Sequence, residues 1–351
     1  MEGIRNPSKF LKLSEIALDQ QKPIVLLKVG RTERAAQIAK GHTGAMAGSY
    51  EIQKKALEKN GVIFVKDYSE LIETLILLER SGKALCTEGV GVIAMSGGSG
   101  VLVSDVAAEA DIKLADFEAN TVDRLSSILP PYSSIRNPLD GVVGVYDPQA
   151  FGECIEIISE DDNVGIVTAF VDCQSGLNER QAKTQARVAV ESAKAIAKLG
   201  KPGLLISNLS DSYSNIVEDA ICDYNIPALK GTREAMLAIN HLLFYSKTKR
   251  NLEERRNDSA AVYVPNEQNQ ALLKHYSTHF PQANVPVYDA SHLISQYGID
   301  IPRSYLASTE EDALIAARKI GYPLVMKIEA SEIVHKSDEG FVMLGLESDE
   351  Q

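Results

Sequence analysis

Short apolar runs alternate with helix-like stretches along most of the sequence, and this alternation constrains the fold more than any other feature. The first runs are Pro23–Val29 and Val62–Val65, and helical patterns at Pro7–Asp19 and Ser49–Asn60 precede them. A further helix is expected at about Ser69–Arg80, where Asp67 and Glu70 stand at the spacing of a capping box. Strands that alternate with helices are typical of a parallel sheet with crossover helices. The sequence therefore predicts an α/β protein.

The alternation resumes after a linker-like stretch at Gly82–Gly89. Five apolar runs predict buried strands at Val90–Met95, Ile112–Ala115, Val164–Val171, Gly203–Ile206 and Ile226–Leu229. Helices are expected between and after them, at Val101–Ala110, Thr121–Leu129, Pro148–Ser159, Glu179–Leu199, Ser212–Tyr224 and Thr232–Lys247. This pattern suits a flavodoxin-like parallel sheet, in which ligands bind at the carboxyl ends of the strands.

A charged stretch at Lys247–Gln270 interrupts the alternation and has the composition of an inter-domain linker. After it we expect two more helices, at Asp289–Tyr297 and Glu310–Ile320. Two more strands are expected at Arg303–Ala307 and Leu324–Ile328. This last region is short for an independent α/β domain. The predicted division is 1–83, 84–248, a linker at 249–284, and 285–351.

The composition excludes several classes of protein. A chain of 351 residues, 44% hydrophobic and 24% charged, is typical of a soluble globular protein of two or three domains. It has neither an apolar run long enough for a membrane span nor a signal-peptide pattern at its start. The net charge of -12 argues against a non-specific nucleic-acid binder. The cysteines have no metal-site or disulfide spacing, so we expect no metal ligands and a cytoplasmic location; they are Cys86, Cys154, Cys173 and Cys222.

The segment Lys40–Gly48, here called the histidine loop, sets His42 among glycines and small side chains. It is expected to end a long loop, Gly30–Gly48, between a strand and a helix. Backbone N–H groups in such a loop, and the start of the next helix, favour an anion. Because neutral imidazole is a nucleophile near pH 7, His42 is a candidate phosphoryl carrier, although an isolated histidine of this kind is more often structural. The candidate phosphate-binding residues beside it are Gly41, Thr43 and Gly44.

A second glycine-rich turn, Ser96–Gly100, follows the apolar run Val90–Met95 and precedes a helical pattern. It matches neither a Walker A sequence nor a dinucleotide fingerprint. One such turn alone is explained by a tight connection without a ligand. Two in neighbouring α/β units favour a shared anion site, where two helix starts would stabilise a phosphorylated histidine. The candidate phosphate-binding residues are Ser96, Gly97, Gly98, Ser99 and Gly100.

Two other side chains are candidates on their own pattern. Glu2 would orient His42 by bonding one ring nitrogen, although a solvated glutamate is the ordinary alternative. Lys327 stands in an apolar strand pattern, where nucleotide phosphate would be a suitable partner; an edge-strand lysine in water is the alternative. The remaining histidines have no supporting pattern and are expected to be structural or at the surface; they are His241, His275, His279 and His292.

Four segments together resemble a known family. Gly41–Gly48, Ser96–Gly100, Asn137–Asp140 and His335–Asp338 occur in the order found in NDP-forming acyl-CoA synthetases. These belong to the succinyl-CoA synthetase superfamily, which includes the ADP-forming acetate–CoA ligases. Gly321–Lys327 adds to the specificity, and the resemblance covers nearly the whole chain.

The resemblance implies an acid–CoA ligase that interconverts acyl-CoA, ADP and phosphate with a carboxylic acid, CoA and ATP through a phosphohistidine. It implies that residues 1–83 and 84–248 are succinyl-CoA synthetase-like domains and that 285–351 begin an ATP-grasp domain. His42 would be the phosphorylated residue, Glu2 its supporting carboxylate, Lys327 a nucleotide-binding lysine and His335 a second histidine that ferries phosphate. The implied ligands are ATP or ADP, CoA and Mg²⁺, with Mg²⁺ bridging nucleotide phosphates.

The sequence also departs from the family pattern. Nothing before Glu2 would form a CoA-binding domain, the ATP-grasp region ends in its first part, and Gly340 is followed by Phe341 rather than a second glycine. We therefore expect a fragment or truncated form, or a chain completed by a second chain or a homo-oligomer. The alternative is a non-catalytic, ligase-like regulatory module of a protein acetyltransferase. That related group often lacks the active histidine, so the presence of His42 favours catalysis. The sequence does not specify the acyl group.

Overall fold

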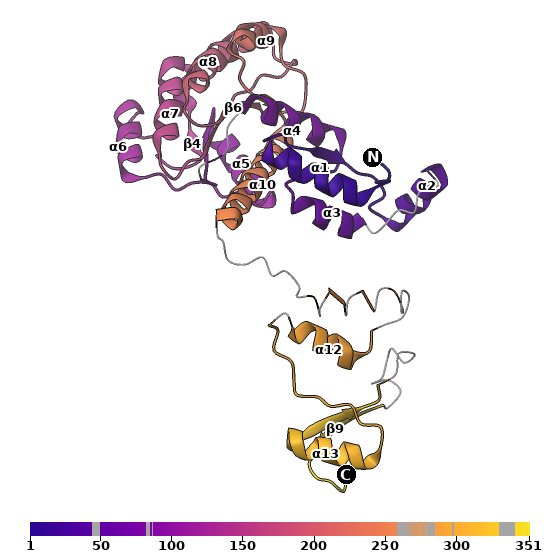
Figure 1. Ribbon diagram of the computed structural model, residues 1–351. Helices are drawn as coiled ribbons and strands as arrows, with labels where there is room; N and C mark the ends of the chain where they lie inside the picture. Colours follow the sequence, from indigo (N-terminus) through magenta and orange to yellow (C-terminus); the bar gives the residue numbers. More distant parts are fainter. Residues whose placement is uncertain are drawn as a thin grey trace. The chain divides into compact units, whose positions relative to one another are not determined.

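The computed structural model describes residues 1–43, 50–81, 85, 87–257, 267, 270–271, 274–275, 278, 285–296, 298–329 and 341–351. Within these ranges, the side chains of 39–43 and 255–257 are excluded from the description. The chain forms two compact units, Met1–Asn257 and Asp258–Gln351, and each is treated by itself (Figure 1).

The first unit opens with a small two-stranded parallel sheet. Its elements are α1 (Pro7–Asp19), β1 (Val25–Leu27), α2 (Glu33–Thr43), α3 (Tyr50–Glu58), β2 (Ile63–Val65) and α4 (Tyr68–Ser81). Val25 of β1 lies opposite Ile63 of β2, and Leu27 lies opposite Val65. A small core of buried side chains lies around this sheet, formed by Leu26, Leu57, Val62 and Phe64.

Two helices of this part begin at the residues that the sequence indicates. The Asn6 side chain accepts a hydrogen bond from the Lys9 N–H at 2.9 Å, and proline follows it at the start of α1. The Asp67 side chain accepts the Glu70 N–H at 2.8 Å in front of α4. The Glu70 carboxylate, however, accepts the Lys66 N–H at 2.8 Å. The described bonds therefore place Asp67 as the cap of α4, while Glu70 turns back to Lys66.

The larger sheet has five parallel strands in the order β4-β3-β5-β6-β7. The strands are β3 (Val90–Ala94), β4 (Leu139–Asp140), β5 (Ile166–Phe170), β6 (Gly203–Ser207) and β7 (Ala228–Lys230). Numbered within this sheet alone, the order is 2-1-3-4-5, which is that of flavodoxin. The predicted flavodoxin-like α/β fold is confirmed here.

Helices cover both faces of this sheet (Figure 1). They are α5 (Gly97–Glu109), α6 (Ala119–Ile128), α7 (Pro148–Glu160), α8 (Glu179–Lys198), α9 (Asn215–Ile221) and α10 (Thr232–Asn257). Short 3-10 turns lie at Val142–Val145 and Cys222–Tyr224. Buried residues of α6, α7, α8 and α9 form one core, which includes Phe151 and Ile155. Residues of α4, α5 and α10, including Leu77 and Ile239, form the other. Helix α4 thus links the small sheet to the large one.

Side chains of α4 also protect the edge strand β7. The Glu73 carboxylate accepts the Lys230 N–H at 3.0 Å, and the Arg80 guanidinium donates to the Ile226 carbonyl at 2.8 Å. One turn before Glu73, the Glu70 carboxylate lies 2.8 Å from Nε2 of His241 on α10. These bonds satisfy outward-facing backbone groups that an edge strand otherwise leaves open. They fix the small sheet against the large one.

Several details of the sequence interpretation are wrong. Ile112–Ala115 makes only an isolated bridge, from Leu114 to Val90, and the fifth strand is Leu139–Asp140 instead. The predicted loop Gly30–Gly48 contains helix α2. Ser96–Gly100 is the cap and first turn of α5 rather than a separate turn. Helix α10 continues past Lys247 to Asn257, because charged residues with good helix propensity extend it into the predicted linker.

Among its described residues, the second unit has one antiparallel strand pair and two helices with defined bounds; residues 267, 270–271, 274–275 and 278 are also helical. Its elements are α12 (Val287–Ser295), α13 (Glu310–Ile320), β8 (Leu324–Lys327) and β9 (Val342–Leu346). The Thr309 side chain accepts the Asp312 N–H at 3.1 Å to cap α13. Acidic residues in the first turn of α13 and basic residues in its last turn complement the helix dipole. The strand expected at Arg303–Ala307 is absent from this described stretch.

Candidate functional site

The order of the five strands reverses between β3 and β5, and helix α5 begins at the carboxyl end of β3. Ser96 caps this helix: its Oγ accepts the Ser99 N–H at 3.2 Å, and its carbonyl accepts the Gly100 N–H at 3.1 Å. The N–H groups of Gly97 and Gly98, at exposed positions, belong to the first turn and have no intrahelical acceptor. In an open sheet of this order, ligands bind at this reversal. The start of α5 is therefore suited to an anion.

The glycines of α5 let a second segment lie against its first turn. A Cβ atom on Gly97 would lie 3.1 Å from Oδ2 of Asp140, and one on Gly100 would lie 3.3 Å from Cβ of Pro138. Asp140 ends β4, and its Oδ1 accepts the Val142 N–H at 3.1 Å. The start of α5 consequently has free N–H donors with a carboxylate fixed beside them.

The side chain of Asn137 holds that segment in place. Its Oδ1 accepts the Val92 N–H at 2.9 Å, and its Nδ2 donates to the carbonyls of Val90 and Ala115 at 2.7 and 2.8 Å. The amide therefore fills the gap along β3 between the bridge at Leu114 and the short strand β4. This explains why the apolar pattern at Ile112–Ala115 does not continue as a full strand.

The backbone of His42 lies in the last turn of α2, with Gly41 and Thr43. Their side-chain placement lies outside the described residues, and so does Gly44. A helix end carries the negative pole of the helix dipole, so α2 does not favour an anion at His42. Donors for an anion there have to come from other elements, such as α5.

Glu2 lies beside the carboxyl end of β1. The Met1 amino group donates to the Leu27 carbonyl at 2.7 Å, and the Met1 carbonyl accepts the Val29 N–H at 3.1 Å. Glu2 follows this bridge, with an exposed side chain and a carbonyl 3.4 Å from Nζ of Lys28. The predicted bond from its carboxylate to His42 is not tested, because the His42 ring lies outside the description.

The sequence interpretation missed Lys28, which follows β1 directly. Its side chain is only 3% exposed. Burial lowers the pKa of this ammonium group below its ordinary value. The sequence signal was present, since Lys28 is the one charged residue within the apolar run Pro23–Val29.

Lys327 and His335 belong to the second unit. Lys327 lies in β8 opposite Val342 and is exposed, so burial does not require it to have a phosphate partner. His335 lies outside the described residues. Neither residue is related here to the sites of the first unit.

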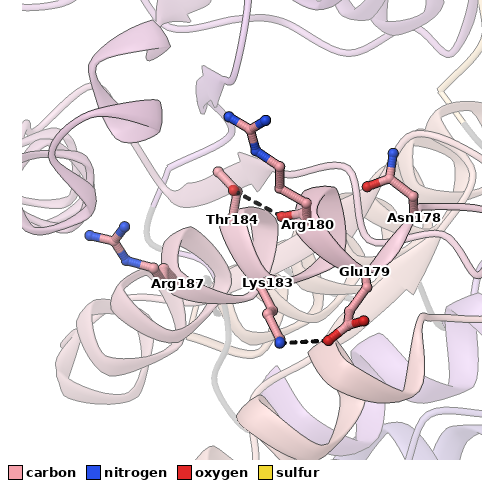
Figure 2. Close-up of a pocket in the computed structure, with 6 residues that line it drawn as sticks. All are labelled: Asn178, Glu179, Arg180, Lys183, Thr184 and Arg187. Atoms are coloured by element: carbon pink, nitrogen blue, oxygen red, sulfur yellow. Dashed lines mark hydrogen bonds and ion pairs between the residues drawn. The ribbon is translucent and has the colours of Figure 1, made fainter.

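A pocket of about 630 Å³ lies along the first half of α8 (Figure 2). It is lined by Asn178, Glu179, Arg180, Lys183, Thr184 and Arg187. Lys183 pairs with Glu179 at 2.6 Å, whereas Figure 2 shows Arg180 and Arg187 extending from the helix. The spacing of these cations on one helical face was visible in the sequence but was not recognised. Exposed guanidinium groups could pair with carboxylate or phosphate.

Thiol and metal chemistry find little support in the described part of the chain. Burial raises the pKa of Cys154 to about 12, and it also raises the pKa of Cys173. Such thiols are poor nucleophiles. Among the described residues, no group of three or more His, Cys, Asp and Glu side chains is arranged to hold a metal ion. Nor does any helix in those residues have the length and apolar character needed to cross a membrane.

The site and fold agree with three protein families. Residues 1–78 match the succinyl-CoA ligase-like flavodoxin domain, residues 90–243 match the ligase-CoA domain, and residues 281–351 match the ATP-grasp domain. Together these define a protein of the succinyl-CoA synthetase type.

Individual relatives narrow the class. The chain is 30% identical over 347 residues to an ADP-forming acetate–CoA ligase of Methanocaldococcus jannaschii, covering 98% of this chain and 47% of the relative. It also matches both subunits of the ADP-forming acetate–CoA ligase II of Pyrococcus furiosus. The α-subunit match is 29% identical and covers 48% of this chain and 36% of the subunit. The β-subunit match is 42% identical and covers 18% of this chain and 27% of the subunit.

A solved structure supports the same fold. It is the dinucleotide-forming acetyl-coenzyme A synthetase 1 of Ca. Korarchaeum cryptofilum, in complex with phosphate and ADP. The TM-score is 0.61 at 24% identity, covering 75% of this chain and 54% of that one. The chain belongs to the NDP-forming acyl-CoA synthetases, as the sequence predicted. It spans about half the length of the curated relatives it matches.

Proposed function

We propose that this chain is part of an acid–CoA ligase that interconverts acyl-CoA, ADP and phosphate with a carboxylic acid, CoA and ATP. The observation that carries the proposal is the start of α5, where the N–H groups of Gly97 and Gly98 lack intrahelical acceptors at the point where the strand order reverses. Membership of a family with ADP-forming ligases supports phosphate as the anion bound there.

The proposed reaction passes a phosphoryl group through His42. A ring nitrogen of His42 attacks the γ-phosphorus of ATP, and the bond to the ADP oxygen breaks. A carboxylate oxygen then takes the phosphoryl group from the histidine, giving an acyl phosphate. Finally the thiol of CoA attacks the acyl carbon, loses its proton and releases phosphate. Each step is reversible, so acyl phosphate also phosphorylates His42.

The proposed roles of the other residues follow from charge and position. The donors at Ser96, Gly97, Gly98, Ser99 and Gly100 stabilise the phosphoryl oxygens. Gly41, Thr43 and Gly44 flank the phosphoryl group, whose N–H donors come from α5, and Glu2 orients the imidazole. Lys327 contacts nucleotide phosphate, and His335 carries phosphate between the nucleotide and His42.

The proposed ligands are ATP or ADP, CoA and a small carboxylic acid or its acyl-CoA. Mg²⁺ would accompany the nucleotide, coordinated mainly by phosphate oxygens and water. The described residues offer no cluster suited to a metal ion, so no step is assigned to Mg²⁺ on this chain.

We also propose the division into domains at 1–83, 84–248 and 285–351, with a linker at 249–284. The matched family ranges support it. A second chain or a homo-oligomer would complete the active protein, and the Pyrococcus furiosus relative with separate subunits supports such an arrangement. A cytoplasmic location is part of the same proposal.

Phosphorylation with radiolabelled acetyl phosphate or ATP tests this function. The protein, supplied with any chain that completes it, is expected to take up label that is stable to base and labile to acid. Peptide mapping should place the label at His42, and His42→Ala should abolish it. Exposed His292→Ala serves as the control and should label normally. Undiminished labelling of His42→Ala would rule out the proposed carrier.

A further inference from the structure

Lys28 is a buried cation without a matching anion among the described residues. The contacts of its Nζ atom are two carbonyl oxygens, those of Glu2 and Val29, each at 3.4 Å. Both distances exceed those of a good N–H···O bond, and an ammonium group has three hydrogens to donate. The ring of Tyr50 lies under the charge, with its centroid 5.5 Å from Nζ. A buried ammonium group satisfied this weakly needs a further partner.

The position of Lys28 indicates what that partner is. Lys28 lies at the carboxyl end of β1, where the doubly wound architecture places its ligands. Tyr50, the aromatic residue beside its ammonium group, is the first residue of α3, and α3 follows the histidine loop in the chain. Glu2, whose carbonyl it contacts, is the proposed carboxylate partner of His42. The cation therefore lies among the segments that lead into and away from His42.

A purely structural role for Lys28 does not explain why a buried charge has only weak contacts. A lysine needed only to hold the first residues against β1 would gain from short bonds, but the terminal amino group and the Val29 N–H already make that connection at 2.7 and 3.1 Å. An aliphatic side chain would fill the same buried position without the desolvation of a charge.

We propose that the ammonium group of Lys28 binds the phosphoryl group carried by His42 and balances its negative charge. This inference rests on the proposed phosphohistidine and adds a side-chain cation to the backbone donors of α5. In a buried setting a charge-assisted hydrogen bond to phosphate is strong and short. The ammonium group would both speed phosphoryl transfer to His42 and slow loss of the group to water.

The test compares Lys28→Met with Lys22→Met, which changes an exposed lysine three residues before the start of the same strand. Labelling by acetyl phosphate and the rise in unfolding temperature caused by inorganic phosphate are both measured. We expect Lys28→Met to label about tenfold more slowly or worse, and to lose most of the phosphate-induced shift. Lys22→Met should match the unchanged protein in both measurements.

The outcomes separate this inference from the proposed function. If the unchanged protein is labelled at His42 and Lys28→Met is labelled equally fast with the same phosphate shift, the role of Lys28 is refuted and the carrier stands. If the unchanged protein takes up no label, the proposed function fails. If inorganic phosphate then raises the unfolding temperature of the unchanged protein and of Lys28→Met equally, the proposed role of Lys28 is refuted as well. Should Lys28→Met fail to fold, Lys28→Gln is judged by the same two measurements.

Discussion

The two junctions that lead from a strand to the helix after it, β1 to α2 and β3 to α5, are built differently. The second is a tight connection whose first turn has no acidic side chain, and its donors are backbone N–H groups. The first has a buried ammonium group, Lys28, at the end of its strand, and the candidate nucleophile His42 at the far end of its helix. The β3–α5 junction therefore offers oriented backbone dipoles, whereas the β1–α2 junction offers side chains that can carry a charge.

This difference suggests that the two junctions have separate roles in phosphoryl transfer. Backbone donors at a helix start are already oriented and need no reorganisation when charge develops. They cannot form a covalent bond, which requires a nucleophile such as imidazole. A phosphorylated histidine also needs neighbours that stabilise its negative charge. The predictions below test whether the β3–α5 junction supplies that stabilisation.

The largest effect is expected from Gly97→Asp, which adds a carboxylate to the first turn of α5 next to Asp140. Repulsion and loss of access should slow labelling of His42 by acetyl phosphate about a hundredfold, the scale for loss of an oriented donor. Gly200→Asp adds the same charge at a glycine with open space around it and should label normally. Normal labelling of Gly97→Asp would show that α5 does not bind the phosphoryl group.

Asn137→Ala should destabilise the first unit more than any other single change at this junction. It removes three hydrogen bonds, those from the Val92 N–H and to the carbonyls of Val90 and Ala115, and the Val90 carbonyl keeps only its bond from the Ala115 N–H. We expect a loss of about 3 kcal/mol in the free energy of unfolding, measured with denaturant. Asn163→Ala loses one side-chain bond to the Asp116 carbonyl at an exposed site, and its loss should stay under about 1 kcal/mol. Equal losses would refute the role of Asn137.

Ser96→Ala tests the cap of α5 alone. Without its Oγ the Ser99 N–H loses an acceptor, which should cost about 1 kcal/mol of stability. Ser126→Ala, whose hydroxyl bonds a carbonyl within α6, is the matched change away from a helix start and should cost less. Thermal unfolding of both variants gives the comparison, and an unchanged midpoint for Ser96→Ala would contradict the capping role.

The smallest effects concern two carboxylates of α4, Glu70 beside His241 of α10 and Glu73 beside strand β7. Burial raises the pKa of Glu70, but its bonds from His241 and Lys66 outweigh this and lower it below the ordinary 4.5. Burial raises the pKa of Glu73 above 4.5, despite its bond from the Lys230 N–H. Glu70 therefore contributes stability that is lost as pH falls below about 4.5. The contribution of Glu73 has the opposite sign and declines as pH rises above about 4.5.

Unfolding free energies measured across this pH range should show the contrast. Glu70→Gln should weaken the loss of stability in acid, by under about 1 kcal/mol. Glu73→Gln, which keeps an acceptor for the Lys230 N–H, should instead weaken a loss of stability that accompanies rising pH. The same pH response in both variants would contradict the opposite pKa shifts.

The sequence correctly predicted the helices and strands that are specified by residues within or next to them. Pro7–Asp19 and Glu310–Ile320 are helices with the predicted bounds, because each has a cap residue directly before it. Most strands were placed to within a few residues from apolar runs alone. The strand at Leu139–Asp140 was missed because it is only two residues long and is defined by its pairing with β3, a contact between segments distant in the chain. The spacing of apolar residues along the sequence does not predict a contact of this kind.

The candidate site was predictable to a similar degree. Ser96–Gly100 was recognised because serine and glycine directly after an apolar run are a strong local signal of a tight strand-to-helix connection. Lys28 and Asn137 were not assigned roles, since burial of a charge and bonding of an amide depend on the folded neighbourhood. Helix α2 was hidden because its apolar content is low, so the glycines at its end dominated the interpretation.

The most direct test is a crystal structure of the phosphorylated protein, prepared with acetyl phosphate and any chain that completes it. The account predicts a phosphoryl group on His42 with oxygens about 3 Å from the N–H groups of Gly97 and Gly98. A phosphorylated His42 whose oxygens lie away from the start of α5, or a phosphoryl group on another residue, would contradict it.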